Sequence, residues 1–108
     1  MKAWEKYFEV EKQVVDKVIK VNKDAIVKAA QILAETTEKG GLIYGFGTGH
    51  SHLVVDDAFW RAATPANYAA LLEHSATGNT EITKSYLVEN TYGIGRIIVD
   101  YNRITPND

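Results

Sequence analysis

The chain has little of what several large classes of protein require. It has no cysteine, so disulfides and thiolate metal sites are excluded. No apolar run approaches the roughly 20 residues of a membrane-spanning helix, and the charged, aromatic start does not resemble a signal peptide. The formal net charge is −2, which does not favour a nucleic-acid-binding face. We therefore expect a cytoplasmic protein that binds neither nucleic acid nor membrane.

What is present is typical of a small globular protein. The chain has 108 residues, of which 45% are hydrophobic and 24% are charged. That length suits one domain better than two, so residues 1–108 are expected to form a single domain. A domain of this size has only a modest core.

The first third of the chain predicts two helices followed by a buried strand. Apolar side chains recur at helical spacing over 3–22 and again over 24–39, with Asp24 as a plausible N-cap of the second helix. Gly40-Gly41 is typical of a helix end. Residues 42–46 are all apolar or glycine, which favours a parallel strand that is covered on both faces.

The rest of the chain continues the α/β alternation. The expected elements are a turn at 47–51, a helix over 51–62 ended by Thr64-Pro65, a strand over 68–72, a polar loop over 73–80 and a helix over 81–89. The spacing of residues 91–102 fits a strand or a helix equally well. Two strands are few for an open sheet. We therefore expect that the chain is a fragment of a longer protein, or that a partner completes the sheet.

The strongest chemical feature is the glycine-rich turn Gly47-Thr48-Gly49-His50-Ser51, which lies between the first strand and a helix. Glycines allow a ligand to approach the backbone closely, and the N–H groups at a helix start favour an anion. The hydroxyls of Thr48 and Ser51 can donate to phosphate or carboxylate oxygens. A tight turn without a ligand is the simpler alternative.

A dinucleotide site is a second alternative. Glu73 follows the second strand, where it could take the place of the ribose-binding acid of a Rossmann fold. His50, however, stands where that fingerprint requires a glycine. The lysine of a P-loop is also missing after the turn.

At this turn the sequence resembles the SIS (sugar isomerase) family. The motif Gly47–His52, followed by Asp56-Asp57-Ala58-Phe59-Trp60-Arg61-Ala62, is similar to the N-terminal part of a bacterial branch related to phosphoheptose isomerase. The resemblance implies a three-layer α/β/α, flavodoxin-like fold with a parallel sheet. It also implies a helix over 91–102, a homodimer or higher homo-oligomer, and a turn that contacts a phosphorylated sugar.

The resemblance is less clear about catalysis. Phosphoheptose isomerases place a glutamate ten residues after the motif serine, where this chain has Arg61, and a cation cannot act as a general base. The nearby groups that could transfer protons are His50, Asp57 and His74. The expected contacts with the sugar phosphate are Gly47, Thr48, Gly49, Ser51, His52, Glu73 and Ser75.

Three functions therefore stay open: a sugar-phosphate isomerase, a non-catalytic phosphosugar-sensing module and a dinucleotide-binding fragment. For the first two we expect no cofactor. We also expect no metal site, because His50 and His52, two residues apart, point in different directions on a helix. The aromatic stripe Trp4, Tyr7 and Phe8 is expected to pack in the core or in a dimer interface.

Overall fold

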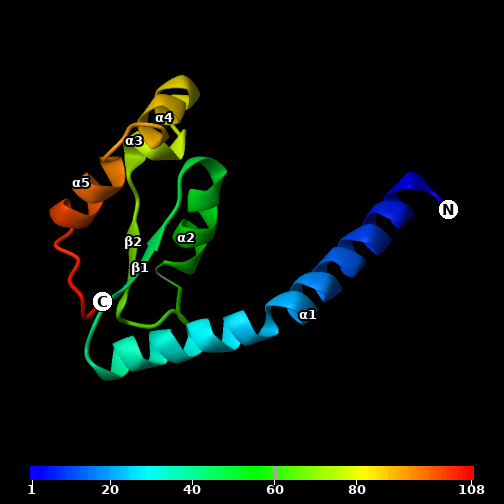
Figure 1. Ribbon diagram of the computed structural model, residues 1–108. Helices are drawn as coiled ribbons and strands as arrows, with labels where there is room; N and C mark the ends of the chain where they lie inside the picture. Colours follow the sequence, from blue (N-terminus) through cyan, green and yellow to red (C-terminus); the bar gives the residue numbers. More distant parts are fainter. Residues whose placement is uncertain (60) are drawn as a thin grey trace. The chain divides into compact units, whose positions relative to one another are not determined.

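The computed structural model describes residues 1–59 and 61–108 and shows an α/β fold (Figure 1). By its internal contacts the chain divides into two compact units, Met1–Glu35 and Thr36–Asp108. The elements in chain order are α1 (Ala3–Glu38), β1 (Ile43–Phe46), a 3₁₀ turn η1 (Gly49–Ser51), α2 (His52–Ala58), β2 (Tyr68–Leu71), α3 (His74–Thr77), α4 (Ile82–Glu89) and α5 (Ile94–Tyr101).

The N-terminal segment is one helix, so the prediction of two helices over 3–22 and 24–39 was wrong. Asp24 lies inside α1 and caps nothing. Between the two predicted helices there is no glycine or proline to stop the first one. The Asn22 side chain donates to the carbonyl of Val18, 2.9 Å away, a bond within the helix that does not interrupt it. The predicted stop at Gly40 is confirmed: φ there is +75°, and its N–H donates to the carbonyl of Thr37.

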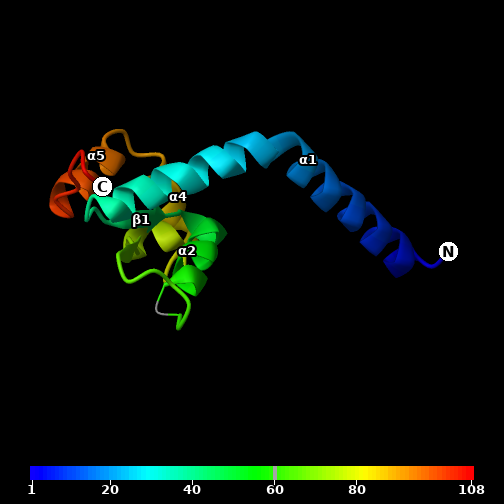
Figure 2. The same ribbon diagram turned by 90° about the horizontal axis from the view of Figure 1, so that it is seen from below.

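The two strands form a parallel pair within the second unit, as predicted. Ile43 lies opposite Tyr68 and Phe46 lies opposite Leu71, so both strands end at the same edge of the sheet. Figures 1 and 2 show α2 running beside the strands. The contact is close at Gly45, where a Cβ would lie 3.0 Å from Cγ1 of Val55 in α2. The same Cβ would lie only 2.0 Å from the hydroxyl oxygen of Tyr68, so glycine at this point of β1 makes room first for the Tyr68 side chain and then for the helix.

Helix α2 is shorter than predicted. It ends at Ala58, and Phe59 is extended (φ −86°, ψ 143°), well before the predicted stop at Thr64-Pro65. The Thr64 hydroxyl donates to the carbonyl of Ala58 over 2.5 Å, which gives that carbonyl at the helix end a partner. The predicted helix also covered Trp60, which lies outside the described residues.

The segment 73–80 was predicted to be a loop, but it contains the short helix α3. The Glu73 carboxylate accepts from the backbone N–H of Ser75, and Gly78 ends the helix with φ +77°. A single turn of helix between Glu73 and Gly78 has no hydrophobic periodicity that would reveal it in the sequence. Residues 94–101 form a helix, as the family resemblance implied.

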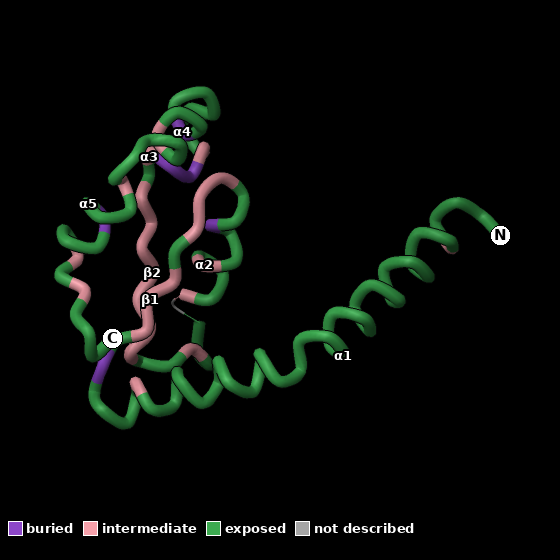
Figure 3. The backbone as a smooth tube through the Cα atoms, in the orientation of Figure 1, coloured by how far each residue is buried: buried purple, intermediate pink, exposed green. Residues whose placement is uncertain are grey.

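The core is small and lies in the second unit. Within residues 1–59 and 61–108, the buried apolar residues are Ala76 and Ile98, and the buried polar residues are His52, Thr77 and Ser85. Figure 3 shows how few positions along the tube are buried. In the first unit, large apolar side chains of α1 are exposed. No helix in the described part of the chain combines the length and apolar character of a membrane span.

The segment after α5 returns to the beginning of β1. The N–H of Leu42 donates to Oδ1 of Asp108 over 2.9 Å, and the N–H of Thr105 donates to Oδ2 over 2.8 Å. These two donors lower the pKa of the Asp108 carboxyl group, the bond from Leu42 contributing most. Any Cβ at Gly41 would overlap the carbonyl oxygen of Asn107, so this return requires glycine.

Candidate functional site

The turn after β1 is tightly folded around Gly47. A Cβ at this position would lie 2.7 Å from the carbonyl carbon of Ser51 and 2.8 Å from the backbone nitrogen of His52. Thr48 is extended, and Gly49 has φ +49°, which reverses the chain into η1 and α2. Both glycines are therefore needed, Gly47 for a close backbone contact and Gly49 for a left-handed conformation.

This turn presents several hydrogen-bond donors. The N–H of Ser51 donates to the carbonyl of Thr48, whereas those of Thr48, Gly49 and His50 have no carbonyl partner among the described residues. Ser51 is exposed and Thr48 is half-buried. The concentration of donors, with no carboxylate in the turn itself, suits an anionic guest.

A cavity of about 280 Å³ lies beside the turn. Its walls come from η1 and α2 on one side and from α3, α4 and their connection on the other; the lining residues are Gly49, His50, His52, Leu53, Thr77, Gly78, Asn79, Ile82 and Ser85. The predicted candidates among them are Gly49, His50 and His52. Asn79, Thr77 and Ser85 were missed, because nothing in the local sequence shows that α3 and α4 lie against η1.

Glu73, His74 and Ser75 begin at the same edge of the sheet as the turn, because Phe46 and Leu71 are paired. Oε1 of Glu73 accepts from the hydroxyl of Ser75 over 2.5 Å and from its N–H over 3.3 Å. These bonds engage Glu73 and Ser75 with each other at the start of α3. The side chain of His74 is exposed.

The two histidines of the motif have very different surroundings. His50 is exposed and borders the cavity. His52 is only 3% exposed. Its Nδ1 contacts the carbonyl of Gly49, and its Nε2 lies 3.2 Å from Nδ2 of Asn79. With both ring nitrogens occupied, His52 has no free ring donor or acceptor for a ligand.

Asp57 lies near the end of α2. It follows Ser51 by six residues along η1 and α2, which corresponds to about 9 Å of helix rise. Its carboxylate forms an ion pair with Arg61, whose Nε also donates to the Asp57 carbonyl over 3.0 Å. The pairing of Asp57 with Arg61 was expected from their spacing. His50, which is part of the turn itself, lines the cavity beside it, whereas Asp57 is not among the lining residues.

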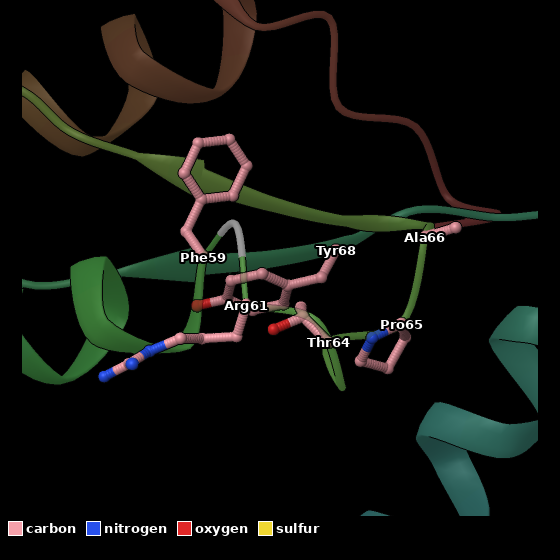
Figure 4. A pocket seen from close by; sticks show the side chains of 6 residues that line it. All are labelled: Phe59, Arg61, Thr64, Pro65, Ala66 and Tyr68. Carbon is pink, nitrogen blue, oxygen red and sulfur yellow. The ribbon is translucent and has the colours of Figure 1, made fainter.

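A second cavity, of about 330 Å³, lies at the other end of β2 and contains none of the predicted site residues. Figure 4 shows its walls: Phe59, Arg61, Thr64, Pro65, Ala66 and Tyr68. In this view Arg61 extends away from Thr64 and Pro65. Among the described residues, no group of three or more His, Asp or Glu side chains is placed to hold a metal ion.

Comparison with known proteins gives one family. The model of the SIS domain matches residues 6–108. A UPF0309 protein of Halalkalibacterium halodurans is 27% identical over 96 residues, which are 89% of this chain and 40% of the relative. A UPF0309 protein of Geobacillus sp. is 38% identical over 58 residues, or 54% of this chain and 24% of the relative. One from Shouchella clausii is 26% identical over 105 residues, or 96% of this chain and 43% of the relative.

These matches agree with the resemblance seen at the glycine-rich turn. Where the match covers most of this chain, the chain spans about two fifths of the length of the curated relatives. The family model begins inside α1 and runs through α5 to Asp108, so it includes the turn, the cavity beside it and both strands. This chain belongs to the SIS-domain family.

Proposed function

We propose that this chain binds a phosphorylated sugar, with the phosphate at the turn Gly47–Ser51. The observation that carries the proposal is the close fold of this turn around Gly47, which leaves the N–H groups of Thr48, Gly49 and His50 without carbonyl partners among the described residues. Membership of the SIS-domain family supports it. A phosphate accepts several hydrogen bonds at once and is therefore the natural guest of such a turn.

The sugar itself would occupy the cavity beside the turn. A volume of about 280 Å³ is close to the lower end of ordinary ligand pockets. Its lining combines polar groups, such as Asn79 and Thr77, with the apolar side chains of Leu53 and Ile82. Glu73 and Ser75 would contact the sugar from the neighbouring strand end.

Between isomerisation and sensing, the geometry favours a binding role for this part of the protein. The carboxylate of Asp57 is exposed and forms an ion pair with Arg61, and Asp57 is not among the residues that line the cavity beside the turn. The remaining candidates for proton transfer are His50 at the cavity and the exposed His74 at the start of α3. In an aldose–ketose isomerase of this family, His50 would be the residue of choice because it borders the proposed sugar site.

A thermal-shift experiment with sugar phosphates tests the binding proposal. At 100 times the dissociation constant a ligand adds about 2.7 kcal/mol to the free energy of unfolding. Ser51→Ala should weaken binding roughly tenfold to a hundredfold, because a hydrogen bond to a charged group contributes about 1.5–3 kcal/mol. The matched control is Thr91→Ala, which removes an exposed hydroxyl at the end of α4.

Control ligands distinguish phosphosugar binding from binding of an unphosphorylated sugar or of a dinucleotide. Unphosphorylated sugars should give no shift, because the proposal assigns the affinity to the phosphate. NAD should also give none, and a shift with NAD alone would favour a dinucleotide site. Equal shifts for phosphorylated and unphosphorylated sugars would rule out the phosphate role of the turn.

The first unit supports the expected homo-oligomer. Trp4, Phe8, Val15, Ile19 and Ile26 recur in α1 at intervals of four and seven residues, and each is about half exposed or more. Such a stripe lies on one face of a helix and is the kind of surface that a second copy can cover. We therefore propose that α1 takes part in self-association.

Ile19→Lys should weaken self-association by roughly a hundredfold or more, because burying an unpaired charge costs several kcal/mol. Gln13→Lys adds the same charge on the opposite face of α1 and should leave the mass unchanged. Light scattering after size exclusion gives the mass of both variants. A monomeric wild-type protein, or a Gln13→Lys variant that dissociates equally, would contradict this interface.

A further inference from the structure

The buried imidazole of His52 links the glycine-rich turn to the connection between α3 and α4. His52 is the most buried of the titratable side chains named in the candidate site, at 3% exposure. Its Nδ1 meets the carbonyl of Gly49 inside the turn, and its Nε2 meets Nδ2 of Asn79, 27 residues further along the chain. One side chain thus joins two separate walls of the cavity.

The two partners assign the protonation of the ring. The amide nitrogen of Asn79 can only donate, so Nε2 of His52 must accept and carries no proton. The carbonyl of Gly49 can only accept, so the proton of the neutral ring lies on Nδ1. In this arrangement both ring nitrogens have a partner within the protein.

Asn79 is held in place by the structure around α3. Glu73 caps the beginning of this helix, and its residues Ala76 and Thr77 are buried. Gly78 then turns the chain with φ +77° and lies against Ser85, whose Oγ would be 3.3 Å from a Cβ at this position. The connection that carries Asn79 is therefore anchored, although the side chain of Asn79 is itself exposed.

We propose that His52 and Asn79 are positioning residues for the anion-binding turn and do not contact the bound phosphate. The carbonyl of Gly49 is fixed by His52, and this fixes the left-handed conformation of Gly49 and the direction of the adjacent N–H groups. Without the contact between His52 and Asn79, the turn populates other conformations. The affinity for phosphate then falls in proportion to the fraction of molecules whose turn has left the binding conformation. The inference rests on the proposed function, because ligand affinity is one of its readouts.

The test uses Asn79→Ala, since an exposed side chain can be removed without unfolding the protein. Affinity for inorganic phosphate should fall about tenfold, as for the loss of one hydrogen bond that orders a site. Amide hydrogen exchange at Gly49, His50 and Ser51 should become faster. The control is Asn90→Ala, which removes an exposed amide that donates to the carbonyl of Tyr86, and it should change neither quantity.

Nitrogen NMR of the His52 ring supplies a readout that does not depend on a ligand. The wild-type protein should show a protonated Nδ1 and an unprotonated Nε2. In Asn79→Asp, a carboxylate replaces the donor, so the ring should take a second proton on Nε2 and the turn amides should stay protected. A wild-type ring protonated on Nε2, or turn amides that exchange at the same rate in Asn79→Ala, would overturn the proposal.

Phosphate affinity, amide exchange and the ring signals together distinguish a failure of the proposed function from a failure of the positioning role. If the wild-type protein does not bind phosphate, the proposed function fails, but amide exchange and the ring signals still decide whether His52 and Asn79 hold the turn. If phosphate binds and Asn79→Ala binds equally well with unchanged exchange, the positioning role fails and the proposed function stands.

Discussion

Replacing Gly47 with alanine is expected to abolish phosphosugar binding and to lower the free energy of unfolding by about 1–3 kcal/mol, as overpacked positions do. The new methyl group would lie 2.7 Å from the carbonyl carbon of Ser51 and 2.8 Å from the nitrogen of His52. Both atoms belong to the backbone, so the clash cannot be relieved by moving a side chain. The turn must open, and its backbone N–H groups then no longer point toward the proposed phosphate site. Urea denaturation and calorimetric titration with a sugar phosphate measure the two effects.

Gly95→Ala is the matched control for this change. Gly95 lies in α5, and a Cβ there would have no other atom within 4 Å. Alanine should therefore raise the free energy of unfolding by about 0.5–1 kcal/mol, the ordinary helix preference of alanine over glycine. If Gly47→Ala behaved like Gly95→Ala in stability and in binding, the tight turn described here would be wrong.

The second large effect is expected at Ile98, which with Ala76 makes up the buried apolar residues in the described part of the chain. Ile98 is 7% exposed and lines a cavity together with Ala70 and Leu71 of β2, so its side chain lies on the side of α5 that is turned toward the sheet. Ile98→Ala should lower the free energy of unfolding by about 2–4 kcal/mol, through lost burial and the space left behind. In so small a core no other large side chain can replace it.

Ile97→Ala is the comparison for Ile98→Ala. The two residues are adjacent in α5 and identical in type, but Ile97 is 63% exposed. Its replacement should change the free energy of unfolding by less than about 1 kcal/mol. Chemical denaturation of both variants gives the difference directly. Equal losses would show that burial does not distinguish these two positions, and that α5 packs differently from the arrangement described.

The parts of the fold that follow from local chemistry could be predicted. The uninterrupted apolar run at 42–46 indicated β1, and the parallel pairing with the segment after Tyr68 is confirmed. Gly40 indicated the end of α1, because only glycine adopts a left-handed conformation there at low cost. The incorrect prediction of two N-terminal helices also has a local cause. Asn22 and Asp24 are weak helix residues, and a weak residue does not end a helix that its neighbours continue.

For the candidate site, the sequence by itself determined the position of the turn. Gly47 and Gly49 directly follow a buried strand and therefore indicate a sharp connection from strand to helix. The motif from Gly47 to His52 identified the family. The Asp57–Arg61 pair also followed from spacing, since residues four apart meet on a helix. These features depend on neighbours within a few residues.

Only the tertiary structure decided which side chains face the turn. His50 and His52 are two residues apart and both line the cavity, yet His50 is exposed and His52 is buried. The difference arises because α3 and α4 pack against η1, which places Asn79 beside His52. A contact between residues 27 positions apart depends on the path of the whole chain between them. Periodicity and motif spacing reflect only residues that are close together in the sequence, so they cannot predict the contact between His52 and Asn79.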